Sequence, residues 1–189
     1  RFVKSKFADE IHKNPVIGTY YYGLNVSKAP FKNNIKLRRA LSLAINRQQL
    51  IDSIGQWGQT PAYGWIPPTI ANYSPYQPAE ASWTQAQRET EAKKLYAEAG
   101  YGAGKPLNLD LLYNTSEGHK KIAVAIGDMW KKLLGVNVSL TNKEWKVYLS
   151  DRTAGNTQVF RAGWFGDYDD PNTFAEILYS QHGMNDVKY

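Results

Sequence analysis

Two periods of apolar residues alternate along this chain, and their order restricts the fold more than any other feature of the sequence. Short stretches of alternating, β-branched or aromatic residues suit strands, whereas apolar residues spaced three and four apart suit amphipathic helices. The strand-like segments are residues 16–25, 107–113, 136–140 and 159–164, and the helix-like segments are 35–55, 82–99, 116–134 and 144–149. Strands that alternate with helices predict an α/β fold, in which crossover helices pack on a twisted sheet.

Two of the helix-like segments have features that fix their expected limits. In the first, the helical spacing of apolar residues continues as far as Gly55, which predicts one continuous amphipathic helix over residues 35–55. In the second, Ser82 with Gln85 forms a capping-box pattern, so we expect the helix to begin there.

The segment between these two helices is rich in both proline and aromatic residues. Residues 58–78 hold five prolines and four tyrosine or tryptophan residues. So many prolines exclude a continuous helix or a central strand. Flexible linkers are poor in aromatic residues, so the segment is predicted to be a long ordered loop that packs on the domain surface or lines a cleft.

The size and charge of the chain limit its class of function. A chain of 189 residues, 42% of them hydrophobic, is long enough for one compact domain. No apolar run approaches the roughly 20 residues that a membrane span needs. The net charge is +6, but the basic residues are scattered, so nucleic acid is not an expected partner. Residues 1–7 contain neither an initiator methionine nor the apolar core of a signal peptide, so we expect a fragment of a longer chain.

Neither a metal nor a cofactor is expected. The chain has no cysteine and only three histidines, which excludes disulfides and thiolate zinc sites and argues against a histidine-rich metal site. The acidic segment that starts at Asp167 has Asn172 and Leu178 where a calcium loop needs glycine and glutamate. The glycine-rich residues 100–105 follow a helix and precede a strand, which is the reverse of the order in a phosphate-binding loop.

The segment that suggests a ligand site most directly is RAGWFGDYDDPNTF, residues 161–174. Here Arg161 can pair with an anionic group and Asp167 with a cationic one, between glycines and aromatic side chains, so a zwitterion suits the site. One of the two following carboxylates, Asp169 or Asp170, is expected to cap the helix that begins at the next proline.

Motifs along nearly the whole chain resemble those of one family. They include TYYY at residues 19–22, APF at 29–31, PAYG at 61–64, LYNTS at 112–116, HKK at 119–121, EWK at 144–146 and RAGW at 161–164. In these motifs the chain resembles the extracytoplasmic oligopeptide-binding proteins that deliver peptides to ABC importers. Dipeptide, murein-tripeptide and nickel binders belong to the same solute-binding family.

The resemblance implies one lobe of a two-lobed periplasmic-binding-protein fold, the Venus flytrap fold. Residues 1–189 are expected to be its C-terminal peptide-binding lobe, a single domain. The implied function is non-catalytic: short peptides bind in the cleft between the lobes, and a monomeric periplasmic or extracytoplasmic protein delivers them to the membrane permease subunits of an ABC importer. A murein peptide, haem or another small solute is the alternative ligand, and a hydrolase using Asp167 and Asp169 is the alternative of another class.

The resemblance also implies roles for four charged residues. Asp167 would take the α-ammonium group of the peptide. Arg161, Arg152 and His119 would be alternative partners for the terminal carboxylate of peptides of different lengths. These pairings are chemically reasonable, because a desolvated carboxylate pairs well with an ammonium group and arginine offers a carboxylate two parallel hydrogen bonds.

Four further residues would contact the rest of the peptide. Trp145 and Trp164 would form walls of roomy side-chain pockets, and the main-chain groups of Gly163 and Phe165 would pair with the peptide as with an added strand. Phe165 replaces a smaller residue expected at its position, which would narrow one pocket. A second departure is Gly55-Gln56, where the oligopeptide branch can supply a lysine for longer ligands.

Overall fold

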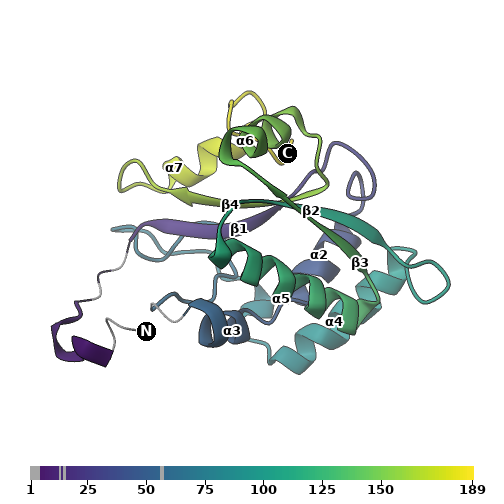
Figure 1. Cartoon of the computed structure of the whole chain (residues 1–189), viewed down its shortest axis with the longest axis horizontal. Coiled ribbons are helices and arrows are strands. Elements are labelled where there is room, and N and C mark those ends of the chain that lie inside the picture. Colours follow the sequence, from purple (N-terminus) through teal and green to yellow (C-terminus); the bar gives the residue numbers. More distant parts are fainter. Residues whose placement is uncertain (1–4, 13, 15, 56–57) are drawn as a thin grey trace.

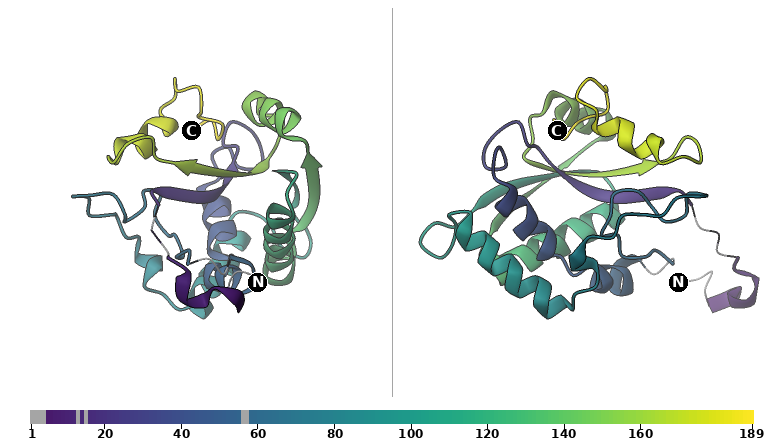
Figure 2. Two further views of the ribbon diagram at one scale, coloured as in Figure 1. Left: turned by 60° about the vertical axis from the view of Figure 1, so that its left-hand side comes forward. Right: turned by 180° about the vertical axis from the view of Figure 1, so that it is seen from behind.

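The computed structural model describes residues 5–12, 14, 16–55 and 58–189 of the chain. A four-stranded sheet lies in the middle of the molecule, with helices on both of its faces (Figures 1 and 2). The strands are β1 (Gly18–Leu24), β2 (Asn108–Asn114), β3 (Asn137–Lys143) and β4 (Val159–Phe165), in the spatial order β1-β4-β2-β3. The predicted α/β architecture is confirmed.

Parallel and antiparallel pairing are both present in the sheet. Strand β2 is parallel to β3, and α5 (Glu117–Leu134) makes the crossover between them. Strand β4 follows α6 (Trp145–Ala154) and is parallel to β2, but only two residue pairs join β4 to β2. Strand β1 runs antiparallel to β4 over seven residue pairs and forms one edge of the sheet. The expected crossover helices are therefore present.

The main core lies between the sheet and the helices α2 (Ile35–Leu43), α4 (Gln85–Glu98) and α5. Trp130 of α5 is its largest buried side chain, and its indole N–H donates to the carbonyl of Leu41 at 2.8 Å. A smaller core on the opposite face holds Tyr148 of α6 against Phe160 of β4. None of the described helices is long and apolar enough to span a membrane.

The prediction of one continuous helix over residues 35–55 is wrong. Helix α2 ends at Leu43, α3 (Arg47–Leu50) starts after a short break, and a π turn (Ile51–Gly55) follows. The side chain of Asn46 accepts the main-chain N–H of Gln49 at 3.0 Å, so it caps a new helix where the apolar period suggested continuation.

The next helix begins two residues later than predicted. Thr84, rather than Ser82, is the N-cap of α4, and its partner in a complete capping box is Gln87. Pro171 occupies the N-cap position of α7 (Asn172–Ala175), and Asp170, one of the two residues expected to cap this helix, accepts the N–H of Asn172 at 2.8 Å.

The proline-rich loop covers the open edge of β1, as expected of an ordered loop on the domain surface. The hydroxyl of Thr19 in β1 donates to the carbonyl of Trp65 at 3.0 Å. The indole of Trp65 packs edge-on against Tyr21 at 4.8 Å between ring centroids and donates to the carbonyl of Phe174 at 2.7 Å. The loop thus protects an edge strand from unwanted pairing.

Two glycines of β1 lie opposite phenylalanines of β4. The register pairs Gly23 with Phe160 and Gly18 with Phe165. A Cβ atom built on Gly23 would lie 2.2 Å from the Phe160 ring, and one built on Gly18 would lie 2.7 Å from the Phe165 ring. Both aromatic rings therefore occupy space that the missing side chains of β1 leave open.

Candidate functional site

The site is built around an edge of β4 that the sheet leaves unpaired. The pairing of β4 with β2 stops after Phe160, although β4 continues to Phe165. Helices α5 and α6 follow the carboxyl ends of β2 and β3, so their first turns lie near this edge, on opposite faces of the sheet (Figure 1). Loops at the carboxyl ends of parallel strands are the usual place for a ligand in sheets of this kind.

The direction of the main-chain groups along β4 follows from its contacts. The carbonyl of Gln158 accepts from Asn25, and the N–H of Gly166 donates to Ile17, so the even-numbered residues face β1. The odd-numbered residues face the other edge, where the carbonyl of Arg161 accepts the hydroxyl of Tyr148. The main-chain groups of Gly163 and Phe165 therefore face the unpaired edge.

Arg161 is a half-buried cation on the α5 side of the sheet. Its guanidinium lies 4.7 Å from the ring centroid of Tyr20, and Nη1 donates to Oδ1 of Asn114 over 3.4 Å. Its Nε is buried without a hydrogen-bond partner. No carboxylate of the described residues forms an ion pair with it. A cation in this state favours an incoming anion.

His119, in the first turn of α5, joins Arg161 through Tyr20. Its Nδ1 lies 3.2 Å from the Tyr20 hydroxyl, and the two ring centroids are 5.8 Å apart. Burial, and then the nearby positive charge of Arg161, lower the pKa of His119 below its ordinary value. The imidazole is therefore neutral at pH 7. The structure brings these two sequence-predicted residues together.

Arg152 is placed apart from that pair, on the α6 side of the sheet. Its Nε lies 2.6 Å from Oδ2 of Asp186, and both side chains are more than nine-tenths buried. The N–H direction is unfavourable for a hydrogen bond, so charge attraction holds the pair together. The guanidinium also lies against the rings of Tyr148 and Phe160. An internal carboxylate thus already neutralises Arg152.

The two tryptophans also lie on the α6 side. Trp145 begins α6, is 49% exposed and stacks on Tyr148 at 5.5 Å between ring centroids. Trp164 is half-buried, and its indole N–H donates to the carbonyl of Thr173 at 2.7 Å. Phe165 points to the opposite side and is 69% exposed. The free edge of β4 is therefore flanked by aromatic rings on both sides.

The three carboxylates after β4 have separate environments. Asp167 is exposed two residues beyond the strand, and its main-chain N–H donates to the hydroxyl of Thr173 at 3.1 Å. Asp169 accepts the N–H of Ala71 at 3.0 Å and so holds the proline-rich loop. Asp170 caps the following turn. Of the three, Asp167 is the one whose carboxylate makes no hydrogen bond or ion pair with another described residue.

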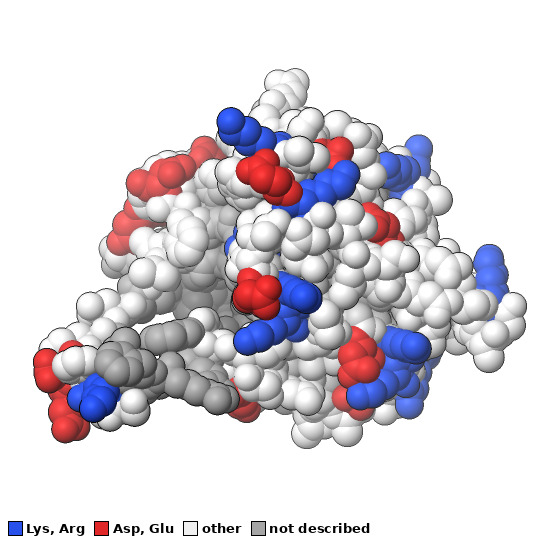
Figure 3. All heavy atoms as spheres, in the orientation of Figure 1, with Lys and Arg blue, Asp and Glu red and all other residues white. Residues whose placement is uncertain are grey.

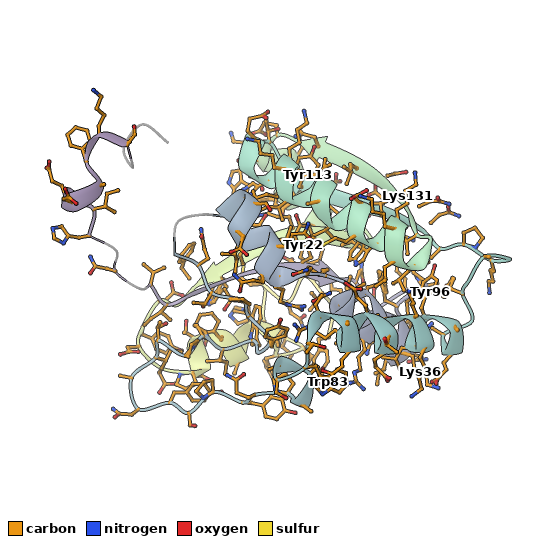
Figure 4. The ribbon with its side chains drawn as sticks, turned by 90° about the horizontal axis from the view of Figure 1, so that it is seen from below. Tyr22, Lys36, Trp83, Tyr96, Tyr113 and Lys131 are labelled. Atoms are coloured by element: carbon orange, nitrogen blue, oxygen red, sulfur yellow. The ribbon has the colours of Figure 1, made fainter. Side chains whose placement is uncertain are left out.

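A cavity of about 300 Å³ lies next to the Arg161 side of the sheet. Its walls include Tyr20 and Tyr22 of β1, Ile122 and Ile126 of α5, Arg47 of α3 and Tyr63 of the loop. Tyr22, labelled near the middle of Figure 4, is half-buried, and burial raises the pKa of its hydroxyl. The cavity is mostly apolar, so it suits a side chain better than a charged terminus.

The structure bears on two other classes of site, a metal site and a nucleic-acid surface. Within the ranges that the structure describes, no three histidine or acidic side chains converge as metal ligands would. On the face shown in Figure 3, lysine and arginine side chains are interspersed with aspartate and glutamate. Such a surface lacks the continuous basic stripe that nucleic-acid binding uses.

Sequence reasoning missed the residues that surround Arg161. The guanidinium of Arg161 contacts Tyr20 and Asn114, and its carbonyl accepts the hydroxyl of Tyr148. None of these three residues was predicted to belong to the site. One signal was present, because Tyr20 belongs to the TYYY motif and Asn114 follows a predicted strand. Which strand lies beside which was the missing information.

Comparison with known proteins gives consistent matches. The model of the bacterial extracellular solute-binding proteins, family 5 Middle, matches residues 2–186. The chain is 45% identical over 187 residues to the periplasmic oligopeptide-binding protein OppA of Escherichia coli (strain K12), covering 99% of this chain and 34% of that protein.

Solved structures of related binding proteins have the same fold as this chain. The murein tripeptide binding protein MppA of Escherichia coli has a TM-score of 0.94 at 40% identity, covering 100% of this chain and 37% of the other. Haemophilus influenzae OppA in complex with RPPGFSPFR has a TM-score of 0.91 at 40% identity, with the same coverage. The chain thus spans about a third of the length of its relatives, and the expected lobe of a periplasmic-binding-protein fold is confirmed.

Proposed function

The chain belongs to the family 5 bacterial extracellular solute-binding proteins, and we propose that it is a lobe that captures short peptides along the free edge of β4. The complete protein would close on the peptide without catalysis and deliver it to the permease subunits of an ABC importer. Its location would be periplasmic or extracytoplasmic and its state monomeric. That residues 1–189 form the C-terminal lobe stays a prediction.

The observation that carries this proposal is the unpaired cation beside an unpaired strand. Arg161 is half-buried and forms no ion pair with any residue that the structure describes, and the main-chain groups of Gly163 and Phe165 face an open edge. A peptide supplies a terminal carboxylate for the Arg161 guanidinium and main-chain hydrogen-bond partners for the open edge of β4. Pairing through the main chain tolerates many sequences, which suits a carrier of varied peptides.

The spacing of the charged groups gives a scale for the ligand. Six residue steps at about 3.3 Å place Asp167 about 20 Å from Arg161 along an extended chain. The two side chains shorten that gap. An extended peptide of about three to five residues, at about 3.4 Å per residue, fits between them with its amino end at Asp167. Such a peptide would run antiparallel to β4.

The proposal is tested by removing the partner of the peptide's amino group. In the complete protein, Asp167→Asn is expected to weaken the binding of tripeptides to pentapeptides by at least about tenfold, because a desolvated ammonium group loses its counter-charge. Isothermal titration calorimetry measures this.

Asp169→Asn is the matched control for that test, because it removes the same charge two residues away. Its amide oxygen can still accept the N–H of Ala71. Affinity should then stay within about threefold of the wild type, since the Asp169 carboxylate is exposed and already pairs with the N–H of Ala71 rather than with the ligand. Unchanged affinity in Asp167→Asn would remove Asp167 from the site. Peptide turnover by the wild type that Asp169→Asn abolishes would favour a hydrolase instead.

The lowered pKa of His119 predicts tighter binding at lower pH. A bound carboxylate favours the imidazolium form, so it raises the pKa of His119 and binding takes up a proton. Affinity should therefore increase as the pH falls from 7.0 to 5.5. The increase can reach about tenfold for each unit by which the bound peptide raises the pKa of His119. The peptide termini, which have pKa values near 3.5 and 7.8, titrate little in this interval.

Calorimetry in two buffers of different ionisation enthalpy would count the protons taken up. His119→Gln should abolish both the uptake and the pH dependence. If affinity in the wild type were constant between pH 5.5 and 7.0, His119 would not contact the carboxylate.

A murein peptide is the second candidate ligand, because the murein tripeptide binding protein MppA resembles the chain as closely as the oligopeptide binders do. Native mass spectrometry of the complete protein, purified without refolding, would distinguish these ligands by mass. It would also detect haem or another small solute.

A further inference from the structure

Tyr20 contacts two of the three groups assigned above to the peptide carboxylate, the guanidinium of Arg161 and the neutral imidazole of His119. Its ring lies beneath the guanidinium of Arg161 at 4.7 Å, and its hydroxyl lies 3.2 Å from Nδ1 of His119. The register places Tyr20 opposite Gly163, so its ring lies on the α5 side of the sheet, next to the free edge. It is 41% exposed and remains accessible to a ligand.

The hydrogen bond to His119 determines which imidazole nitrogen carries the proton. An imidazole nitrogen is a much stronger base than a phenol oxygen, so the hydroxyl of Tyr20 donates to Nδ1. The proton of the neutral ring then belongs on Nε2. With Nδ1 occupied by Tyr20, the Nε2–H remains as a donor for another group.

The ring of Tyr20 also restricts Arg161. A guanidinium stacked on an aromatic face keeps its N–H groups in the plane parallel to the ring, where they remain available to an acceptor. Tyr20 is itself supported by Tyr22, whose ring meets it edge-on at 6.1 Å between centroids. Tyr22 thus contacts Tyr20, and Tyr20 in turn contacts Arg161 and His119.

Resting on the proposed function, we infer that Tyr20 is a positioning residue for the peptide carboxylate. It holds Arg161 and His119 as one unit and selects the His119 tautomer that donates from Nε2. The ligand class this favours is a peptide with a free carboxylate, over the same peptide with a C-terminal amide. Tyr20 would thereby set the preference for unblocked peptides.

The experiment compares Tyr20→Phe with the wild type in the complete protein, using a tripeptide to pentapeptide series as acids and as C-terminal amides. Tyr20→Phe keeps the ring under Arg161 and removes the hydroxyl. The wild type should bind the acids at least about tenfold more tightly than the amides. In Tyr20→Phe, acid affinity should fall about fivefold and amide affinity should stay the same.

Nitrogen-15 NMR of the His119 ring provides the readout that a merely structural role would not change. The wild type should show a single Nε2–H tautomer, and Tyr20→Phe a mixture. Tyr22→Phe is the matched control, because it removes a neighbouring tyrosine hydroxyl and leaves Tyr20 in place between Arg161 and His119. It should leave both the tautomer and the preference for acids unchanged.

Three results would contradict the inference in different ways. Unchanged acid affinity in Tyr20→Phe, or an unchanged His119 tautomer, would remove the positioning role. An equal loss for acids and amides would show a general structural effect. If the wild type bound acids and amides equally, the carboxylate role of Arg161 itself would fail, and with it both this inference and that part of the proposed function.

Discussion

Replacing Arg161 by methionine in the complete protein is expected to weaken the binding of a free-carboxylate peptide by at least about 30-fold. The guanidinium has no counter-ion among the described residues, so the peptide carboxylate would complete its pairing. Removing one partner of a desolvated charge pair costs roughly 2–5 kcal/mol of binding free energy. The lower limit corresponds to an affinity about 30-fold weaker. Methionine retains much of the side-chain volume beside Tyr20. Calorimetry with acid and amide forms of one peptide measures the loss.

Lys131→Met provides the matched control, because it removes one positive charge from an exposed residue (labelled in Figure 4) in the last turn of α5, whereas His119 lies in the first turn. Its effect on affinity should be less than about twofold at physiological ionic strength, since distant exposed charges are screened. Equal affinity of Arg161→Met and the wild type for the acid peptide would contradict the assignment of Arg161. A similar loss in Lys131→Met would show that net charge, and not position, matters.

Substituting alanine for Gly23 should destabilise the fold by about 2–3 kcal/mol, the size typical of overpacking a core. Its Cβ would lie 2.2 Å from the ring of Phe160, which is fully buried against Tyr148 and cannot swing away. At about 2–4 °C per kcal/mol for a domain of this size, the melting temperature of the 189-residue chain should fall by about 5–10 °C. Thermal unfolding followed by circular dichroism measures this.

Gly18→Ala separates the steric effect from the loss of glycine as such. The Cβ of this variant would also approach a phenylalanine of β4, but the Phe165 ring is 69% exposed and can turn toward solvent. We expect a change of less than about 1 kcal/mol, because rotating an exposed side chain costs little. Equal destabilisation by both substitutions would show that the conformational freedom of glycine, rather than the buried ring, controls stability in β1.

Local patterns were sufficient to predict the strands and most of the helices, while the roles proposed for the charged residues came from the family resemblance. Alternating residues gave β2 and β3, and the exposed Asp167 and half-buried Arg161 came from one short segment. The errors came from competing local signals. Asn46 caps a new helix inside an unbroken apolar period, and Thr84 with Gln87 forms a second possible box beside Ser82 with Gln85.

What the sequence could not supply was the order of the strands. A pairing of β4 with β2 that ends after Phe160 depends on twist and on the packing of two helices, which no local pattern encodes. The separation of Arg152 from Arg161 has the same origin, since α6 and α5 lie on opposite faces. The partner of Arg152, Asp186, is distant in sequence and becomes a neighbour only when the chain folds.

The side chains of β4 alternate between the two faces of the sheet, and the side chains of a peptide paired with β4 would alternate in the same way. Successive side chains of an extended peptide point to opposite faces of the sheet that it joins. Along this edge one face presents Arg161, His119 and the 300 Å³ cavity, and the other presents Trp145 and Trp164. Odd and even positions of one peptide would therefore meet two different chemical environments. Lengthening a peptide by one residue would exchange the face that its last side chain meets.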